Sequence, residues 1–389
     1  MARMGRDFWH RSGWLAVALL VAMVGMGGAA LAEGAAGGSG FNPANLAKIS
    51  LPPGFKIQVF AEVPRARSMA VGEPMGVVFV GTRFDKLYAV VDRNKDGVGE
   101  EVVAIASDLK VPNGVAFKDG FLYVAEQHRV IRYAAPEFDI YRQFPPEVIF
   151  EGLPDKFAHG WRYAAVGPDR KLYVAVGIPC NICDPQGIEG TIIRMDLDGR
   201  NMEVYASGVR NSVGMDWHPV TGEMFFTNNG ADGLGDDEPP DTLLHAPRPG
   251  LYFGFPYVPT AGGSSPTPGY EGRQPPQPIT RAVMNFQAHV APLGIHFYRG
   301  NMFPEEYRNS AFVALHGSWN RSVPVGYEVL RIKFDDRGLP VSQEVFATGW
   351  LQGRAAWGRP VDIKELHDGS LLISDDFAGV IYRVTYEGR

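Results

Sequence analysis

Short runs of alternating hydrophobic and polar residues recur along the chain, and Gly, Pro or Asp residues separate them. Clear instances cover residues 76–90, 114–133, 163–177, 214–230, 308–321 and 361–386. Alternation with a period of two is typical of β-strands, because successive side chains point to opposite faces of a sheet. The chain contains 47 Gly and 30 Pro among 389 residues. This surplus of turn-forming residues also favours many short strands over long helices.

The runs repeat at a regular distance. One strand of each unit aligns with the others on Val77, Leu122, Leu172, Met224, Ala311 and Leu371. The spacing is roughly 50 residues, and up to four strands fit in each unit, which is typical of a β-propeller. The interval after Met224 is longer because it contains a Gly-, Pro- and Ser-rich insertion at 239–278. We therefore predict an all-β, six-bladed β-propeller over residues 41–389. A β-sandwich or two tandem β domains would explain the strands but not their recurrence.

The two ends of the predicted propeller carry strand patterns that could pair. The last run, VIYRVTY at 380–386, ends close to the C-terminus, and KIQVF at 56–60 lies near the start of the ordered sequence. Pairing of these segments would complete the last blade and remove open sheet edges.

The N-terminus has a different pattern. Arg3, Arg6 and Arg11 precede an uncharged run that ends in the small-residue motif Ala-Leu-Ala at 30–32. Such a sequence is typical of a secretory signal peptide at 1–32, which predicts export to the periplasm. An uncleaved membrane anchor is the alternative, whereas no span is expected after cleavage. Residues 33–40 are Gly- and Ala-rich and predict a flexible linker.

Charge and cysteine content narrow the function further. The formal net charge is −6 and there is no basic stripe, so nucleic acid is not an expected partner. The only cysteines are Cys180 and Cys183. In an exported chain this pair predicts a local disulfide, whereas redox chemistry or half of a zinc site is the alternative.

Several polar residues lie beside the aligned strands, where the loops of a propeller surround its central channel. His159 precedes the third unit and suits general base chemistry, although it could simply pack beside Trp161. Arg210, Arg321 and Arg359 occupy similar loop positions. Three arginines converging on one channel mouth would favour an anionic ligand with carboxylates or phosphates.

Two loops are rich in oxygen ligands. The segment at 230–241 contains five acidic residues and suits Ca²⁺, although it could be only an exposed acidic turn. A second segment, from Asp92 to Gly97, matches the opening of an EF-hand loop. Val103 stands where that motif needs Glu, so a plain turn is the alternative and a second calcium ion stays open. No Ser-hydrolase elbow, zinc-peptidase, P-loop or dinucleotide motif occurs in a matching context.

Several segments resemble the pyrroloquinoline quinone (PQQ)-dependent sugar dehydrogenase family, and more closely its sorbosone-dehydrogenase-like branch. They are HGWRYAAVGPDRKLYVAVG, RNSVGMDWHPVTGEMFFTNNG, LGDDEPPD, GFPY, ALHGSWNRS and GRPVDI. The resemblance runs in order from about Leu51 to Tyr386. It implies a six-bladed propeller that binds PQQ at the mouth of its channel, with Ca²⁺ beside the quinone.

The resemblance also implies roles for particular residues. His159 matches the family's catalytic base. Arg210 and Asn211 match an arginine–asparagine pair at the quinone, and Arg359 matches an arginine that contacts PQQ carboxylates. Arg321 stands where the glucose dehydrogenases carry lysine.

The calcium ligands and one further cofactor contact complete this set. Gly230 and Ala231 match the two positions whose backbone carbonyls bind calcium, although the glucose dehydrogenases have proline at the second. Their glutamine contact has no clear counterpart, and Asn113 is the nearest candidate. These departures weaken the case for glucose as the substrate more than they weaken the case for PQQ binding.

The function that follows is a periplasmic, PQQ- and calcium-dependent dehydrogenase. It would oxidise a sugar or a related aldose or aldehyde by hydride transfer to the quinone, with His159 as general base. Asp184 follows Cys183, so there is no haem-attachment motif, and a separate electron acceptor, a cytochrome or a quinone, is expected. A calcium-dependent lactonase and a non-catalytic exported binding propeller are the alternatives.

Overall fold

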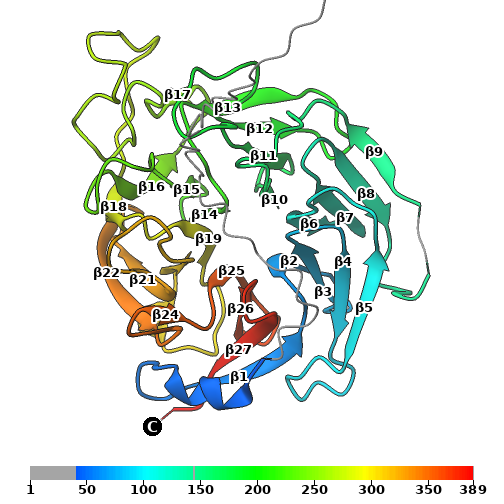
Figure 1. Ribbon diagram of the computed structural model, residues 1–389. Helices are drawn as coiled ribbons and strands as arrows, with labels where there is room; N and C mark the ends of the chain where they lie inside the picture. Colours follow the sequence, from blue (N-terminus) through cyan, green and yellow to red (C-terminus); the bar gives the residue numbers. More distant parts are fainter. Residues whose placement is uncertain (1–40, 143–144, 389) are drawn as a thin grey trace, which may run out of the picture. The chain divides into compact units, whose positions relative to one another are not determined.

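Six antiparallel sheets are arranged as the blades of a β-propeller in this computed structural model, which describes residues 41–142 and 145–388 (Figure 1). The predicted all-β, six-bladed fold is therefore confirmed. The signal peptide and linker predicted at 1–40 lie outside the described residues. Within those residues, no helix is long and apolar enough to cross a membrane.

Each blade has four strands that follow one another along the chain, apart from the last blade. The strands of blades 1 and 2 are β2 (Ala66–Val71), β3 (Val78–Thr82), β4 (Leu87–Val91), β5 (Glu101–Ala106), β6 (Gly114–Lys118), β7 (Phe121–Ala125), β8 (Val130–Ala134) and β9 (Glu147–Phe150). Those of blades 3 and 4 are β10 (Ala164–Val166), β11 (Leu172–Val176), β12 (Thr191–Met195), β13 (Glu203–Ser207), β14 (Met215–Trp217), β15 (Met224–Asn228), β16 (Pro240–Ala246) and β18 (Met284–Ala288). Those of blades 5 and 6 are β19 (Pro292–Phe297), β20 (Ala311–Leu315), β21 (Glu328–Phe334), β22 (Pro340–Ala347), β25 (Pro360–Glu365), β26 (Leu371–Asp375), β27 (Val380–Tyr386) and β1 (Phe55–Glu62).

Smaller elements complete the structure. Strand β17 (Leu251–Tyr252) pairs in parallel with β13, and β23 (Leu351–Gln352) pairs with β24 (Ala355–Ala356). Two short 3-10 helices cover Pro43–Lys48 and Glu305–Tyr307.

The sixth blade closes the ring with strands from both ends of the described chain. Strand β1 pairs antiparallel with β27, from Phe55 opposite Tyr386 to Glu62 opposite Val380. This confirms the predicted pairing of KIQVF with VIYRVTY. It closes the ring, because β1 of the last blade leads directly along the chain into β2 of the first blade.

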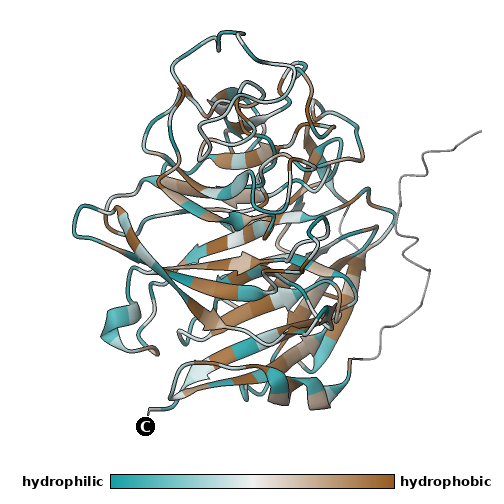
Figure 2. Ribbon diagram, turned by 60° about the vertical axis from the view of Figure 1, so that its left-hand side comes forward, coloured by the Kyte–Doolittle hydropathy of each residue, from teal (hydrophilic) through white to brown (hydrophobic). Residues whose placement is uncertain are grey.

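The hydrophobic core is divided among the six blade–blade interfaces. In β11, Leu172 and Val174 pack toward blade 2, whereas Tyr173 and Ala175 pack toward blade 4. This is the period-two pattern of a strand that is buried on both faces. Figure 2 shows the result, with hydrophobic colour on the blade strands and more hydrophilic colour on the loops.

The six aligned positions all fall at or beside the second strand of a blade, β3, β7, β11, β15, β20 or β26. The insertion differs from the prediction at its start. Residues 240–246 form β16, so the extra segment begins after Ala246 and reaches β18. Pro239 directly precedes β16 and Pro240 is its first residue, so the composition of this segment resembles that of a loop.

The first strands of the blades, β2, β6, β10, β14, β19 and β25, lie nearest the centre of the ring (Figure 1). Because neighbouring strands in a blade run in opposite directions, two kinds of loop share one end of the propeller. These are the loops that lead into each first strand and those that join each second strand to the third. We call this end the mouth, and the candidate catalytic, cofactor and calcium residues from the sequence lie there, apart from the EF-hand-like loop at 92–97.

Candidate functional site

His159 lies in the loop that leads into β10, with a left-handed backbone conformation at φ 51°. Its Nδ1 lies 2.5 Å from the carbonyl oxygen of Ile178. Because a carbonyl can only accept, Nδ1 carries the hydrogen, and Nε2 keeps a lone pair in the neutral ring. Burial, with the nearby positive charge of Arg210, lowers the pKa of His159 to about 4. The imidazole is therefore neutral and able to accept a proton near pH 7.

Gly177, which follows β11, allows two candidate residues to come close together. A Cβ atom at Gly177 would lie 2.7 Å from the Cβ of His159 and 2.9 Å from Oδ1 of Asn211. Both distances are shorter than van der Waals contact permits. A glycine at this position therefore sets how closely His159 approaches Asn211.

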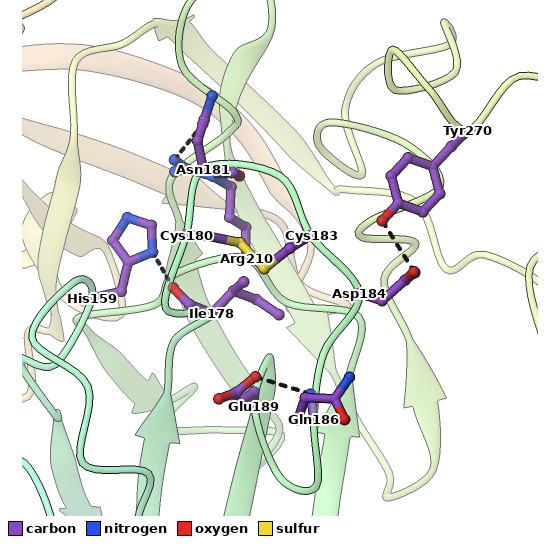
Figure 3. The surroundings of a disulfide bond; sticks show 10 residues. All are labelled: His159, Ile178, Cys180, Asn181, Cys183, Asp184, Gln186, Glu189, Arg210 and Tyr270. Atoms are coloured by element: carbon purple, nitrogen blue, oxygen red, sulfur yellow. Dashed lines mark hydrogen bonds between the residues drawn. A yellow bond between two sulfur atoms is a disulfide. The ribbon is translucent and has the colours of Figure 1, made fainter. Parts of the chain in front are cut away.

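Arg210 is buried and fixed by several acceptors. Its Nε donates to the carbonyl of Asn181 at 3.0 Å, and its Nη2 donates to Oδ1 of Asn181 at 2.8 Å and to Oδ2 of Asp232 at 2.7 Å. Only 2% of the Arg210 side chain is exposed. The structure thus brings Arg210 to the loop after β15, next to Asn181 and near His159 (Figure 3).

The predicted disulfide between Cys180 and Cys183 is present in the loop between β11 and β12 (Figure 3). It closes a short turn that contains Asn181, the residue that holds Arg210. On its outer side, Asp184 accepts hydrogen bonds from Tyr270 at 3.1 Å and from Arg273 at 3.2 Å. The turn therefore connects the insertion after β16 to the mouth.

Gly230 and Ala231 lie in the loop between β15 and β16. The backbone N–H of Gly230 donates to Oδ1 of the buried Asp241 at 2.7 Å, and Ala231 N–H donates to the carbonyl of Pro259 at 3.1 Å. The other oxygen of Asp241 accepts from Ala291 N–H at 2.8 Å. Within residues 41–142 and 145–388, no hydrogen-bond donor reaches the carbonyl of Gly230 or Ala231. Two carbonyl oxygens are thus available as hard ligands for a cation.

Arg321 contacts the same acidic loop from blade 5. Its guanidinium donates to the carbonyl of Asp236 and, at 3.1 Å, to the carboxylate of Asp237. Its Nε is buried and meets no acceptor in the described part of the chain. The neighbouring Asn320 donates to Asp232 at 2.8 Å, and its Oδ1 is likewise buried without a donor among the described residues.

Arg359 does not join Arg210 and Arg321 but lies in a second cluster, around Asp376. Oδ2 of Asp376 accepts from Arg67 at 3.1 Å and from Arg83 at 3.2 Å. Its Oδ1 accepts from Nε2 of His316 at 3.0 Å and lies 3.1 Å from Nη2 of Arg359. The Asp376 side chain is fully buried, and the surrounding positive groups hold its pKa well below the usual range.

Sequence reasoning missed four members of this cluster: Arg67, Arg83, His316 and Asp376. His316 stands in the segment ALHGSWNRS, and Asp376 directly follows an aligned strand, so their loop positions were a usable signal. The contact between these residues could not be predicted, because residues 67 and 376 lie at opposite ends of the chain and come together only when the ring closes.

Asn113 connects the second cluster to His159. It is fully buried, and its Oδ1 accepts from Nε of Arg67 at 2.7 Å. Its Nδ2 donates to the carbonyl of Arg162 at 2.6 Å, and Nη1 of Arg162 donates to the carbonyl of His159 at 3.2 Å. Both the oxygen and the nitrogen of the Asn113 amide are thus already hydrogen-bonded, and they hold Arg67 and the backbone of Arg162.

The EF-hand-like loop lies away from the mouth, between β4 and β5. Carboxylate oxygens of Asp92, Asp96 and Glu100 lie within 4.8 Å of one another. Both oxygens of Asp92 already accept backbone N–H groups, from Asp96 at 3.2 Å and Gly97 at 2.8 Å. The hydrogen bonding is that of a plain turn.

Comparisons with known proteins agree with this architecture. A family model described as TrAA12-like matches residues 271–387. An uncharacterised protein of Borreliella burgdorferi is 36% identical over 356 residues, which cover 87% of this chain and 91% of that protein. The calcium structure of Trichoderma reesei Carbohydrate-Active Enzymes Family AA12 has a TM-score of 0.75 at 18% identity, covering 87% of this chain and 97% of that chain.

A second solved structure, the holo form of the pyranose dehydrogenase PQQ domain from Coprinopsis cinerea, has a TM-score of 0.71 at 17% identity. The similarity covers 87% of this chain and 97% of that domain. The chain therefore belongs to the same family as the Borreliella burgdorferi protein, and its fold is that of the PQQ-dependent sugar dehydrogenases that its sequence motifs resemble.

Proposed function

We propose that the protein is a PQQ- and calcium-dependent dehydrogenase that oxidises a sugar or a related aldose or aldehyde. The observation that carries this proposal is the state of His159 at the mouth. Its Nδ1 is committed to Ile178, its Nε2 has a lone pair, and its pKa of about 4 keeps it neutral. A histidine so prepared can take a proton from a substrate hydroxyl group.

The charges of the mouth fit an anionic cofactor. PQQ carries three carboxylates, and arginines bind carboxylates with directed, charge-assisted hydrogen bonds. Arg67, Arg83 and Arg359 all contact the carboxylate of Asp376, so three guanidinium groups lie close together at the mouth. The buried Nε of Arg321 meets no acceptor among the described residues, so a bound carboxylate would satisfy it.

The loop after β15 fits calcium. Ca²⁺ binds carbonyl and carboxylate oxygens in flexible geometry. Gly230 and Ala231 would supply two backbone carbonyls, and Asp241 fixes the loop by accepting the Gly230 N–H. The buried Oδ1 of Asn320 is a further oxygen at this loop that meets no donor among the described residues.

Each residue would then have a separate task. Arg210 and Asn211 would orient the cofactor, and Arg210 also disfavours protonation of His159 through its charge. Nε2 of His159 would accept the proton of a substrate hydroxyl group while hydride leaves the carbon that bears this hydroxyl group. When bound, PQQ supplies the hydride acceptor, and calcium supplies Lewis acidity beside it.

The cellular setting is part of the proposal. The signal-peptide pattern at 1–32 supports export, and we propose a periplasmic enzyme that passes electrons to a separate cytochrome or quinone.

Reconstitution of the purified apoprotein tests this function. PQQ and Ca²⁺ together should produce quinone absorbance on the protein and dye-linked oxidation of at least one member of a sugar panel. Protein treated with a chelator before PQQ is added serves as the matched control and should show neither. Lactone hydrolysis without PQQ would instead identify a lactonase. PQQ binding without oxidation of any sugar or aldehyde in the panel would indicate a binding propeller.

A further inference from the structure

Glu137 is a buried carboxylate that lies away from the mouth, in the loop between β8 and β9. It is only 4% exposed, and neither of its carboxylate oxygens has a hydrogen-bond partner within residues 41–142 and 145–388. Gly72, which follows β2, brings the backbone of blade 1 close to it, because a Cβ atom at Gly72 would lie 2.8 Å from Oε2 of Glu137. A buried carboxylate without partners is costly, so this group needs either a proton or a positively charged ligand.

The surroundings of Glu137 do not supply that positive charge. Burial raises the pKa of Glu137, and the negative charge of Glu73 adds to the rise. The backbone N–H of Met75 opposes it in part, without completing a hydrogen bond to either oxygen. In the part of the chain that the structure describes, no Lys, Arg or His forms an ion pair with this carboxylate. A cation from solution would therefore be the first counter-charge it meets.

Glu137 lines a cavity of about 130 Å³, which is room for a small organic ligand rather than for one water molecule. The cavity lies between blades 1 and 2, which are neighbours in the ring (Figure 1). Its walls come from the loops β2–β3, β4–β5 and β8–β9, which are at the end of the propeller opposite to the mouth. Most of the other lining side chains are apolar: Met75, Val77, Val91, Phe138, Ile140 and Tyr141.

Two of these walls are aromatic rings that remain in solvent. Phe138 is 65% exposed and Tyr141 is 64% exposed. The face of an aromatic ring attracts cations, and organic ammonium ions most of all when a carboxylate lies nearby. Arg93 also lines the cavity, but its guanidinium donates to the carboxylate of Glu101, at 2.9 Å from Nη2. Its charge is therefore already paired, whereas that of Glu137 is not.

The apolar walls distinguish an organic cation from a metal ion. Ca²⁺ and Mg²⁺ need six or more oxygen ligands, counting water, and this cavity offers few. An alkyl chain next to an ammonium group would instead bury its carbon atoms against Met75, Val77 and Val91.

We propose that this cavity binds an organic ammonium ion, with its charge against Glu137 and its alkyl part against the apolar walls. The site is independent of the proposed function, because none of its residues lies at the mouth. The simpler account is that Glu137 keeps a proton and the cavity holds only water. That account predicts no affinity for ammonium ions.

The test measures binding of n-butylamine, which is an ammonium ion near neutral pH, to the purified protein by calorimetry. The uncharged n-butanol, of nearly the same shape, is the control ligand. Glu137→Gln removes the charge and keeps the size of the side chain. Glu73→Gln is the matched control variant, because it removes a neighbouring carboxylate that is exposed and does not line the cavity.

We expect wild type to bind n-butylamine and not n-butanol. Glu137→Gln should bind the amine at least about tenfold more weakly, and Glu73→Gln should stay within about twofold of wild type. If Glu137→Gln does not fold, Phe138→Ala takes its place, because the ring is exposed, and a loss of at least about threefold is expected there. Absence of amine binding to wild type, equal binding of n-butanol, or unchanged affinity in the variant used would overturn the inference.

A second amine identifies the source of the ammonium group. Nα-acetyl-lysine amide carries the same alkylammonium chain on a blocked backbone, as a lysine side chain of another protein would present it. If it also binds in a manner that depends on Glu137, a lysine side chain is supported as the ligand. If n-butylamine alone binds, a small free amine is supported. PQQ takes no part in these measurements, so failure of the proposed function would leave their outcome unchanged.

Discussion

Oδ1 of Asn181 accepts a hydrogen bond from Nη2 of Arg210 at 2.8 Å, inside the turn that the disulfide closes. The same oxygen accepts the backbone N–H of Asp232, also at 2.8 Å. One side-chain oxygen thus joins a candidate cofactor arginine to the loop that contains the candidate calcium carbonyls.

The first prediction concerns the disulfide. Replacing Cys180 and Cys183 by Ser should loosen the turn and weaken PQQ and Ca²⁺ binding, because Asn181 would no longer be held against Arg210. The wild-type mature protein, unreduced, should have a mass two hydrogens below that of the dithiol form. Unchanged affinity for both ligands in the folded double variant would show that the turn orders itself without the bond.

The second prediction concerns Gly177. A methyl group there would press on the Cβ of His159 and on Oδ1 of Asn211, so Gly177→Ala should displace both side chains. We expect a large fall in kcat with a smaller change in thermal stability. Gly222→Ala is a useful control, since it lies in a turn where an added Cβ meets nothing within 4 Å. Its positive φ makes some loss of stability expected, but not of kcat.

The third prediction concerns pH. Only the neutral ring of His159 can accept a proton, and its folded-state pKa of about 4 lies below the ordinary value of 6.5. The contribution of this group to the rate should therefore be level from about pH 6 to 8 and fall as pH drops toward 4. A pH profile of kcat/KM that rises with an apparent pKa near 6.5 would contradict the burial of this histidine.

The same shift affects stability. Between about pH 4 and 6.5 the unfolded chain binds a proton at His159 that the folded protein does not. Stability due to this group should therefore decrease as pH falls through that window.

The fourth prediction concerns the arginines at the mouth. Arg210→Ala, Arg321→Ala and Arg359→Ala should each weaken PQQ binding by about 1.5–3 kcal/mol, the scale of a charge-assisted hydrogen bond. Arg337→Ala is the control, because Arg337 is 79% exposed and pairs only with Asp335 among the described residues. Loss of affinity in the control alone, or in none of the four, would place the cofactor elsewhere.

The architecture could be read from the sequence because each blade repeats a local signal. Leu172 and Tyr173 alternate between two buried faces, and turn residues separate such runs. The position of the second strand in each blade therefore follows from the spacing of the runs. The disulfide was also predictable, since two nearby cysteines in a chain with a signal-peptide pattern have few other expected uses.

The side-chain partnerships of the site could not be read in this way. Spacing placed Arg210 and Arg359 at the mouth but did not reveal that they face different carboxylates, Asp232 and Asp376. The sequence offers Asn113 as a cofactor contact, which stays a prediction, but it does not reveal that the Asn113 amide holds Arg67. Such contacts depend on how blades meet in space, which no local pattern records.

The most direct test of the account is the reduction of bound quinone by sugar in the His159→Asn variant. Asn tolerates the left-handed backbone at φ 51° better than Ala does, so the loop should keep its shape while the base is lost. His367→Asn is the control, because this exposed residue lies in the turn between β25 and β26, away from the mouth. We predict that His159→Asn retains PQQ and Ca²⁺ but reduces the quinone about 10²–10⁴-fold more slowly than wild type, with the control unchanged. Quinone reduction at a near-wild-type rate in a fully loaded His159→Asn protein would contradict the mechanism.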